Sequence, residues 1–339
     1  MFLKKIEIKS FRCLDNIKLS FDSEKSIRKQ TILLGENDTG KTNLLKAIAL
    51  ITAGSNALGE LLGNPDDWIQ YGKDFCEIKA ELITKKFEEK SVSITIKRGD
   101  TLKDIIIWNQ KSLTEIDDAI NNETMNYFVI AYGSYRRLGK ERNGKYFEDI
   151  RARNISSLFN KDSVLNHLES WVIDLDYREQ NEGLEVVRQT LNSFLTDITF
   201  KEIDKKKKQL LFNTKDGVIP LNYLSDGYQN IAVWIGDLLY KITSTFEDYK
   251  SPLTARGLLL VDEIDLHLHP KWQRIILDFI SKNLPNFQLI ATTHLPFIAQ
   301  QSDKNELFYF QRDNELIKLK DFNENNKSFD NIIGYFEKN

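Results

Sequence analysis

The stretch Gly35-Glu-Asn-Asp-Thr-Gly40-Lys41-Thr42 decides the expected fold. It matches the pattern G-x-x-x-x-G-K-[ST], in which glycines let the backbone curl so that its N–H groups face a bound phosphate. The pattern requires a strand before it and a helix after it. The apolar run 30–34 predicts that strand, and apolar residues at helical spacing over 41–52 predict that helix. The sequence therefore predicts a phosphate-binding loop in an α/β fold, with the positive end of a helix dipole beside it.

The loop supplies most of the residues that we expect to bind a nucleotide. Lys41 is placed to bridge the β- and γ-phosphates, and the Thr42 hydroxyl is placed to bind Mg²⁺ beside them. ATP and Mg²⁺ are therefore the expected cofactors. The nucleotide-binding candidates in this segment are Gly35, Asn37, Asp38, Thr39, Gly40, Lys41, Thr42 and Asn43.

A second motif, Gly257-Leu-Leu-Leu-Val261-Asp262-Glu263, is typical of a buried strand that ends in two acids. In open α/β sheets, ligands bind at the carboxyl ends of the strands, so both acids are expected beside the phosphates. Asp262 is a candidate ligand of Mg²⁺. Glu263 is placed to accept a proton from an attacking water, which makes it the first catalytic candidate.

Two further motifs follow the same logic. Ser225 in Leu224-Ser-Asp-Gly-Tyr-Gln-Asn230 is a good N-cap for a helix that we expect to run to about residue 249. His294 ends the strand-like run 287–293, and the spacing from Glu263 leaves room for one crossover helix between two parallel strands. His294 is therefore the second catalytic candidate, expected at the same edge of the sheet as the two acids.

The composition is that of an ordinary globular protein. The chain has 339 residues, of which 41% are hydrophobic and 29% are charged, with a formal net charge of -3. This balance argues against a nucleic-acid coat protein, although the basic stretch 136–153 and Lys205–Lys208 favour local contact with DNA. The chain has 2 cysteines, too few for a disulfide scaffold. No run approaches the ~18 apolar residues of a membrane span, and residues 1–12 lack a signal-peptide core, so we expect no membrane contact and a cytoplasmic location.

The rest of the pattern predicts one domain, 1–339, that contains two distinct regions. Alternating apolar residues predict an antiparallel strand region over 76–132, which includes Ile105–Ile107. Leucines and valines at helical spacing predict a helical insert over 155–197. Further strands are expected over 2–8, 17–21, 198–203, 209–213 and 307–310.

Taken together, these motifs resemble those of the ABC-type ATPases of the SMC and RecF-like group, and more closely the compact bacterial AAA-domain proteins related to the OLD and PtuA families. The opening Ile8-Lys-Ser-Phe-Arg12 matches the start of that group, Leu224–Gln229 its signature, and Asp262-Glu263 its second Walker motif. Asp265–Pro270 matches its D-loop region, and His294 its switch histidine. The resemblance implies an α/β P-loop NTPase fold of the ABC or SMC-head type, with a mixed central sheet, an antiparallel β subdomain and a small helical insert.

The same resemblance implies roles for further residues. In the group, the arginine that matches Arg12 reaches the nucleotide phosphates, and Gln70 in Trp68-Ile-Gln-Tyr-Gly is the candidate for the Q-loop residue at the metal. ATP lies between the phosphate loop of one subunit and the signature of the other, which implies a homodimer. Ser225, Asp226 and Gly227 would then act in trans, with Asp226 in place of a glycine of the group's pattern.

For the whole protein, the resemblance implies an ATP-hydrolysing dimeric switch or clamp. It would be the ATPase component of a bacterial system, such as an anti-phage defence system, acting with an effector protein such as a nuclease or on DNA. The long coiled coil of SMC proteins is absent, and we expect no room for the C-terminal TOPRIM nuclease of OLD-type proteins.

Three alternatives stay open. The first is a nucleotide sensor or scaffold with little turnover that assembles an effector such as a nuclease. The second is a metal-dependent nuclease built on Glu263, Asp265, His267 and His269, which the D-loop assignment disfavours. The third is a P-loop kinase, which would leave the order of the signature, the two acids and the histidine unexplained.

Overall fold

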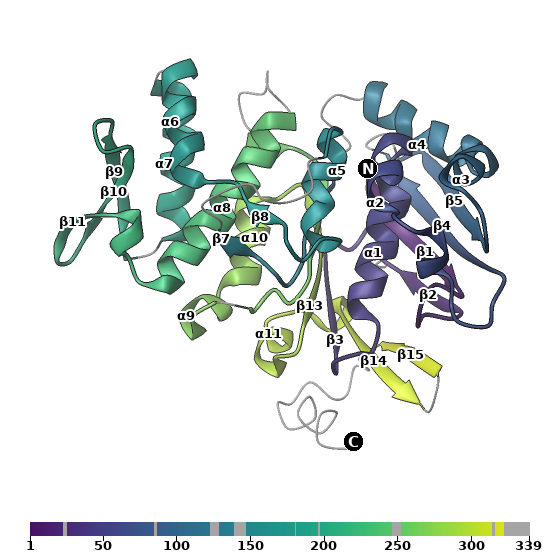
Figure 1. The fold of residues 1–339 in the computed structure, drawn as a ribbon. Coiled ribbons are helices and arrows are strands. Elements are labelled where there is room, and N and C mark those ends of the chain that lie inside the picture. The colour runs from purple at the N-terminus through teal and green to yellow at the C-terminus, as the bar shows by residue number, and fades with distance from the viewer. Residues whose placement is uncertain are drawn as a thin grey trace.

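A computed structural model gives the fold of the chain (Figure 1). It describes residues 1–22, 26–84, 87–122, 129–138, 147–179, 181–195, 197–245, 252–266, 268–313 and 316–321. The central feature is a six-stranded sheet with the strand order β15-β14-β3-β13-β12-β6. Neighbouring strands run parallel except for β14 and β15, which are antiparallel. The strands are β3 (Gln30–Gly35), β6 (Val129–Tyr132), β12 (Gly257–Val261), β13 (Phe287–Thr293), β14 (Leu307–Asp313) and β15 (Leu316–Asp321).

Both faces of this sheet are covered, so its central strands are buried along their whole length. Every residue of β12 and β13 is buried, as expected for parallel strands between two layers. Along β3, Leu33 packs into the core on one side, whereas Ile32 and Leu34 pack into the core on the other. Because β3, β12 and β13 are parallel, their carboxyl ends lie at one edge of the sheet.

One face is covered by α1 (Lys41–Thr52) and by a four-stranded antiparallel sheet of order β2-β1-β4-β5. Helix α1 contacts strands of both sheets, and the second sheet lies on its far side in Figure 1. Buried and more exposed residues alternate along the antiparallel strands, as the sequence pattern predicts. These strands are β1 (Phe2–Lys9), β2 (Ile17–Ser20), β4 (Phe75–Ile83) and β5 (Glu89–Lys97).

The expectation of an antiparallel strand region over 76–132 is wrong in its second half. Ile105–Ile107 lies in helix α3 (Leu102–Trp108), which is followed by α4 (Gln110–Asn122). The hydroxyl of Thr101 accepts from the backbone N–H of Asp104 and the Asp104 carboxylate accepts in return, a capping box that starts the helix. The strand β6 then joins the central sheet parallel to β12, so within 76–132 antiparallel pairing ends with β5.

The other face of the central sheet carries the long helix α8 (Asp226–Thr245), with α6 (Leu168–Glu179) and α7 (Asn181–Phe194) packed against it. This group includes the helices expected over 155–197. A small antiparallel sheet of order β11-β10-β9 extends beyond them (Figure 1). Its strands are β9 (Thr199–Asp204), β10 (Gln209–Thr214) and β11 (Gly217–Pro220), and Lys205–Lys208 forms the turn between the first two.

Short elements connect these layers. Two of them, α5 (Ile150–Ile155) and η2 (Ser156–Leu158), lie against the edge strand β6. No helix in the described ranges is long and apolar enough to span a bilayer. The remaining short elements are α2 (Ser55–Leu61), η1 (Pro65–Trp68), β7 (Arg137–Leu138), β8 (Val164–Leu165), η3 (Leu221–Tyr223), η4 (Pro252–Thr254), α9 (Pro270–Gln273), α10 (Ile276–Asn283), α11 (Pro296–Gln300) and η5 (Lys304–Glu306).

Candidate nucleotide site

Two positions in the loop between β3 and α1 require glycine. Gly40 has a φ of +88°, and a Cβ there would lie 2.6 Å from Cδ2 of Leu14. Gly35 has a φ of +154°, and a Cβ there would lie 2.6 Å from the carbonyl oxygen of Phe310. A side chain at either position would strain the backbone and meet a neighbouring segment. The two glycines therefore let the loop pass directly beside β14 and enter α1 through a left-handed turn.

Lys41, the first residue of α1, is buried inside this loop. It is 5% exposed, and its Nζ donates to the carbonyl oxygens of Gly35 at 2.7 Å and Glu36 at 2.5 Å. Burial lowers the pKa of Lys41 to about 8, and the carboxylates of Asp262 and Glu263 oppose this shift. The ammonium is thus desolvated and held only by neutral carbonyls, which are weaker partners than a phosphate.

Asp262 follows β12 and meets the start of α1. The hydroxyl of Thr42 donates to Asp262 Oδ2 at 2.8 Å, and the hydroxyl of Thr292 donates to Asp262 Oδ1 at 2.7 Å. Asp262 is 3% exposed, so its carboxylate has a fixed position. A carboxylate oxygen and a hydroxyl oxygen side by side are the hard donors that Mg²⁺ prefers, and this pair fits such an ion.

Glu263 and His294 complete the edge. Glu263 has a φ of +49°, a left-handed conformation that is rare for a residue with a side chain, and its N–H donates to Thr292 Oγ1 at 2.7 Å. His294 Nε2 lies 3.4 Å from Glu263 Oε1, and His294 Nδ1 lies 3.1 Å from the carbonyl oxygen of Gly35. The imidazole thus spans the space between the phosphate loop and the second acid, which hold its ring in one orientation.

These residues line one cleft. Its empty space is about 580 Å³, part of which opens to solvent. The cleft brings together almost all the nucleotide-binding and catalytic candidates from three separate segments, as the sequence predicts. The lining residues are Asn37, Asp38, Thr39, Gly40, Lys41, Thr42, Asn43, Asp262, Glu263 and His294.

Three candidates, Arg12, Gly35 and Gln70, are absent from that lining, although the carbonyl oxygen of Gly35 contacts Lys41 and His294. The Arg12 guanidinium stacks on the Trp68 ring at 4.2 Å, and its Nε donates to the carbonyl oxygen of Asp67 at 3.1 Å. Burial lowers the pKa of Arg12. Burial also lowers the pKa of Lys46 on α1, and the positive charge of Arg12 lowers it further. The N–H of Gln70 donates to the carbonyl oxygen of Ser10, and its Oε1 is buried. In this conformation of the chain, neither side chain belongs to the cleft.

The signature residues also lie outside the cleft of their own chain. Ser225 and Asp226 are exposed at the start of α8, where the carbonyl of Ser225 accepts the first helical hydrogen bond, from the N–H of Gln229. A Cβ on Gly227 would lie 3.4 Å from the Trp272 ring, ordinary van der Waals contact. The exposure of Asp226 explains how an acidic side chain fits where the group's pattern has glycine. The first backbone N–H groups of a helix have no partner within the helix itself.

Arg136 contacts the site from behind and is not among the candidates from the sequence. Its guanidinium donates to the carbonyl oxygens of Asp262 at 2.9 Å, Glu263 at 2.6 Å and Leu266 at 3.2 Å. Burial lowers the pKa of Arg136 to about 10, and the nearby acids, led by Asp262, oppose the shift. The segment after β12 is therefore clamped from behind by one buried cation. The available signal was the position of Arg136 just after β6, the strand next to β12.

The basic stretch 136–153 is not one uniform surface. Arg136 points inward, as just described, and Arg151 is paired with Asp149 and Asp117 at 2.8 and 3.0 Å. The members Lys140, Arg142 and Lys145 lie outside the described residues. Lys206–Lys208 is exposed in the β9–β10 turn, which belongs to the small sheet beyond α6 and α7.

The described part of the chain holds no group of three or more histidines, cysteines or acids that could bind a metal by themselves. Asp265 instead accepts a hydrogen bond from Thr293 at 2.5 Å, and His269 caps α9 by accepting from the N–H of Lys271. His267, the remaining member of the nuclease alternative, lies outside the described residues. Among the described residues, the alternative of a nuclease centre therefore has no support.

A phosphate loop beside β3, an Asp-Glu pair after β12 and a histidine after β13 are the parts of a P-loop nucleotide site, here in a fold of the SMC-head type. The chain belongs to the family described as "AAA domain, putative AbiEii toxin, Type IV TA system", whose model matches residues 110–299. A second model, described as "AAA ATPase domain", matches residues 1–154.

The chain is also similar to two relatives and to one solved structure. Septu protein PtuA of Bacillus mycoides (strain KBAB4) is 31% identical over 87% of this chain and 38% of its own length. The retron Ec83 probable ATPase of Escherichia coli is 27% identical over 68% of this chain and 42% of its own length. The chain therefore spans less than half of either relative. The SMC head domain from Thermotoga maritima shares the fold, with a TM-score of 0.53 at 13% identity over 95% of this chain and all of that one. The expected fold class is confirmed.

Proposed function

We propose that the protein hydrolyses ATP in the cleft and uses the bound nucleotide to close a dimer. The convergence of Lys41, Thr42, Asp262, Glu263 and His294 from three segments at one sheet edge carries this proposal. A nucleotide-binding loop alone would need neither a second acid nor a histidine next to it. The same arrangement favours turnover over the alternative of a sensor that only binds ATP.

The proposed roles follow from the geometry. The loop and Lys41 bind the β- and γ-phosphates, while Thr42 and Asp262 hold Mg²⁺. When bound, Mg²⁺ neutralises charge on the phosphate oxygens and orients them. Glu263 accepts a proton from the attacking water, and His294 holds the Glu263 carboxylate on one side of the cleft. Arg136 acts as a positioning residue, because it fixes the carbonyls on both sides of the Glu263 N–Cα unit from behind.

The dimer follows from what the single chain leaves exposed. The α8 N-terminus with Ser225 and Gly227 is an anion-binding element that lies outside the cleft of its own chain. A second copy would place it against the γ-phosphate, so each ATP would be held by two chains. Duplex DNA and an effector protein such as a nuclease are the proposed partners. We also propose a role in bacterial defence, which the similarity to PtuA and a retron ATPase supports.

A subunit-mixing experiment tests the shared site. Lys41→Ala removes phosphate binding in one chain, and Ser225→Arg places a bulky cation at the α8 start of another. Each variant alone should have little ATPase activity. When the two are mixed, heterodimers contain one intact composite site, and we expect roughly a quarter of the activity of the unmodified protein for random pairing. Mixtures that stay as inactive as the separate variants would contradict catalysis in trans.

A further inference from the structure

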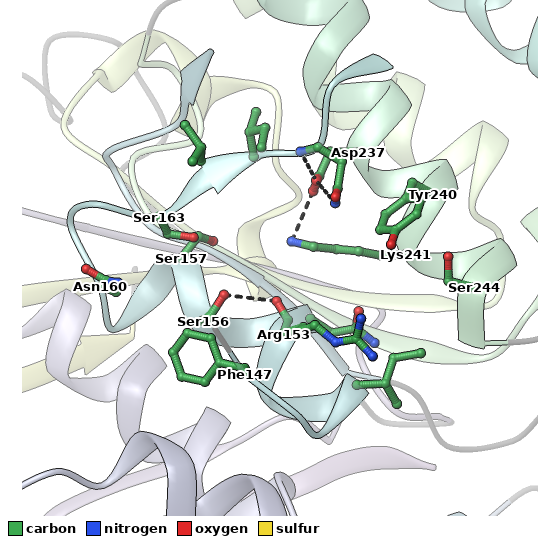
Figure 2. A pocket seen from close by; sticks show the side chains of 15 residues that line it. Phe147, Arg153, Ser156, Ser157, Asn160, Ser163, Asp237, Tyr240, Lys241 and Ser244 are labelled. Atoms are coloured by element: carbon green, nitrogen blue, oxygen red, sulfur yellow. Dashed lines mark hydrogen bonds and ion pairs between the residues drawn. The ribbon is translucent and has the colours of Figure 1, made fainter. Parts of the chain in front are cut away.

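A second cavity lies apart from the ATP cleft (Figure 2). It is enclosed by α5, η2 and β8 on one side and by the second half of α8 on the other. Its empty space is about 960 Å³, part of which opens to solvent, and its lining shares no residue with that of the ATP cleft. This volume accommodates a small organic molecule.

Two cationic side chains reach this cavity, Lys241 from α8 and Arg153 from α5. Lys241 is 6% exposed, and among the described residues its Nζ pairs with Asp237 at 3.0 Å and lies 4.2 Å from the centre of the Tyr132 ring. An ammonium carries three donors, so donors remain for a ligand. The Nε of Arg153 is buried and makes no hydrogen bond to any described residue. A buried guanidinium donor without a partner is costly, and an anion in the cavity would satisfy it.

The one carboxylate in the described lining is already fully engaged. Asp237 Oδ1 accepts from the N–H and side-chain amide of Asn166 at 2.8 and 2.7 Å. Asp237 Oδ2 accepts from the hydroxyl of Tyr132 at 2.8 Å and from Lys241. Asp237 therefore positions Lys241 and does not face a ligand with free oxygens. With two cations and one acid, the described ionisable lining carries a net positive charge.

The remaining walls combine polar and flat apolar groups. Ser163 and Asn160 approach from the η2–β8 side, and both are labelled beside the cavity in Figure 2. The rings of Phe147 and Tyr240 and the side chain of Leu165 supply apolar surface. Hydroxyl and amide donors near cations suit phosphate oxygens, and aromatic walls suit a planar ring.

We propose that this cavity is a binding site for a small phosphomonoester that carries a flat ring. The phosphate lies between Arg153 and Lys241 and satisfies the free donors of both. The ring packs between Phe147 and Tyr240. A phosphomonoester offers three phosphate oxygens to the donors of Arg153 and Lys241, whereas a carboxylate offers two.

Calorimetry with phenyl phosphate tests this site on the full chain. The ATP cleft is first saturated with Mg²⁺ and a non-hydrolysable ATP analogue, so that the probe cannot bind there. We expect one phenyl phosphate per chain, bound at least about tenfold more tightly than inorganic phosphate because of the ring. Benzoate, which has the ring without the phosphate, should bind at least about tenfold more weakly than phenyl phosphate.

Two variants and one control locate the binding. Arg153→Gln should weaken phenyl phosphate binding at least about tenfold, through loss of a charge-assisted contact. Ser163→Phe fills the cavity and should abolish binding. Lys161→Gln removes an exposed cation that does not line the cavity and should change the affinity less than about twofold. Lys241 is left intact because its loss would strand the Asp237 charge.

Retained binding of the ATP analogue shows that each variant is folded. If Ser163→Phe is not folded, the result for Arg153→Gln alone decides whether the proposal holds. The proposal is overturned if phenyl phosphate does not bind at millimolar concentration, or if Arg153→Gln binds it as well as the unmodified chain does. Equal affinities for benzoate and phenyl phosphate would overturn the assignment of the ligand as a phosphate ester.

Discussion

At the scale of single residues, burial of Lys41 makes proton uptake part of ATP binding. The pKa of Lys41 is lowered to about 8 without nucleotide, and bound phosphates raise it again by favouring the ammonium. The protonated form is therefore the one that binds. Affinity should be highest below pH 8 and should fall as the pH rises through and above that value, by up to about tenfold per pH unit.

Calorimetry at about pH 9 in buffers of different ionisation enthalpy measures the number of protons taken up when ATP binds. We expect net uptake of a sizeable fraction of one proton per ATP at that pH. At about pH 6.5 the ammonium is fully formed in both states, so the contribution of Lys41 should vanish there. Equal proton uptake at the two pH values would contradict the assignment.

Arg136 gives a second prediction at this scale. Its loss removes one donor from each of three carbonyls in the segment after β12, of which the Glu263 carbonyl keeps the N–H of Leu266. The loss also frees Glu263 to leave its left-handed conformation. Arg136→Gln should therefore lower kcat by about 10- to 100-fold, the cost of misplacing a catalytic group. ATP affinity should change less than about threefold, because Arg136 does not line the cleft.

The measurement is steady-state ATPase activity beside ATP affinity by calorimetry, with Lys161→Gln as the charge-matched control. Arg136→Lys keeps the charge but not the planar fork, so it should recover only part of the loss. If Arg136→Gln weakens ATP binding and leaves kcat unchanged, Arg136 does not position the base.

At the scale of elements, α8 is tied to β6 through buried charge. Asp237 and Lys241 on α8 pair at 3.0 Å, and Tyr132 of β6 donates to the same carboxylate. Lys241→Met leaves the Asp237 charge unpaired in the interior, which should cost about 3–5 kcal/mol of the free energy of unfolding. Tyr132→Phe removes one hydrogen bond and should cost about 1–3 kcal/mol. Urea unfolding of the two variants checks the order, and a larger loss for Tyr132→Phe would contradict it.

The same scale shows what the sequence could predict. From the apolar runs of β3, β12 and β13 we expect the acids and the histidine that follow them to meet at one sheet edge, and in the structure they line one cleft. Such strands are predictable because buried parallel strands leave a strong local pattern. Three consecutive isoleucines predict a strand but lie in α3, since the pattern of so short a run does not separate a strand from a buried helix. The capping box at Thr101 and Asp104 was the overlooked signal.

Other failures have a different physical cause. Arg136 was counted with a surface charge run, because its partners are backbone carbonyls distant in sequence and carry no side-chain signature. Arg12 and Gln70 are candidates by resemblance alone, and in this structure Arg12 stacks on Trp68 and neither side chain lines the cleft. The cleft lining does not include the signature residues Ser225, Asp226 and Gly227. Their absence agrees with a role in trans but does not test that role.

At the scale of the whole molecule, the proposed switch depends on two surfaces of one chain. The cleft opens where β3, β12 and β13 end, whereas the exposed start of α8 belongs to the helical side. ATP held between these surfaces in two chains would join them only while the γ-phosphate is present. Hydrolysis would then release the dimer, which is the property of a nucleotide-driven switch.

The most direct test of this claim is single-turnover hydrolysis by Glu263→Gln, with size-exclusion chromatography in the presence of ATP and Mg²⁺. Glutamine keeps the shape of Glu263 but cannot accept a proton, so ATP should still bind while hydrolysis falls by about 100- to 10,000-fold. The variant should therefore elute as an ATP-bound dimer that dissociates when ATP is removed. Normal turnover by Glu263→Gln would show that Glu263 is not the base, and slow turnover by a chain that stays monomeric with ATP would contradict the switch.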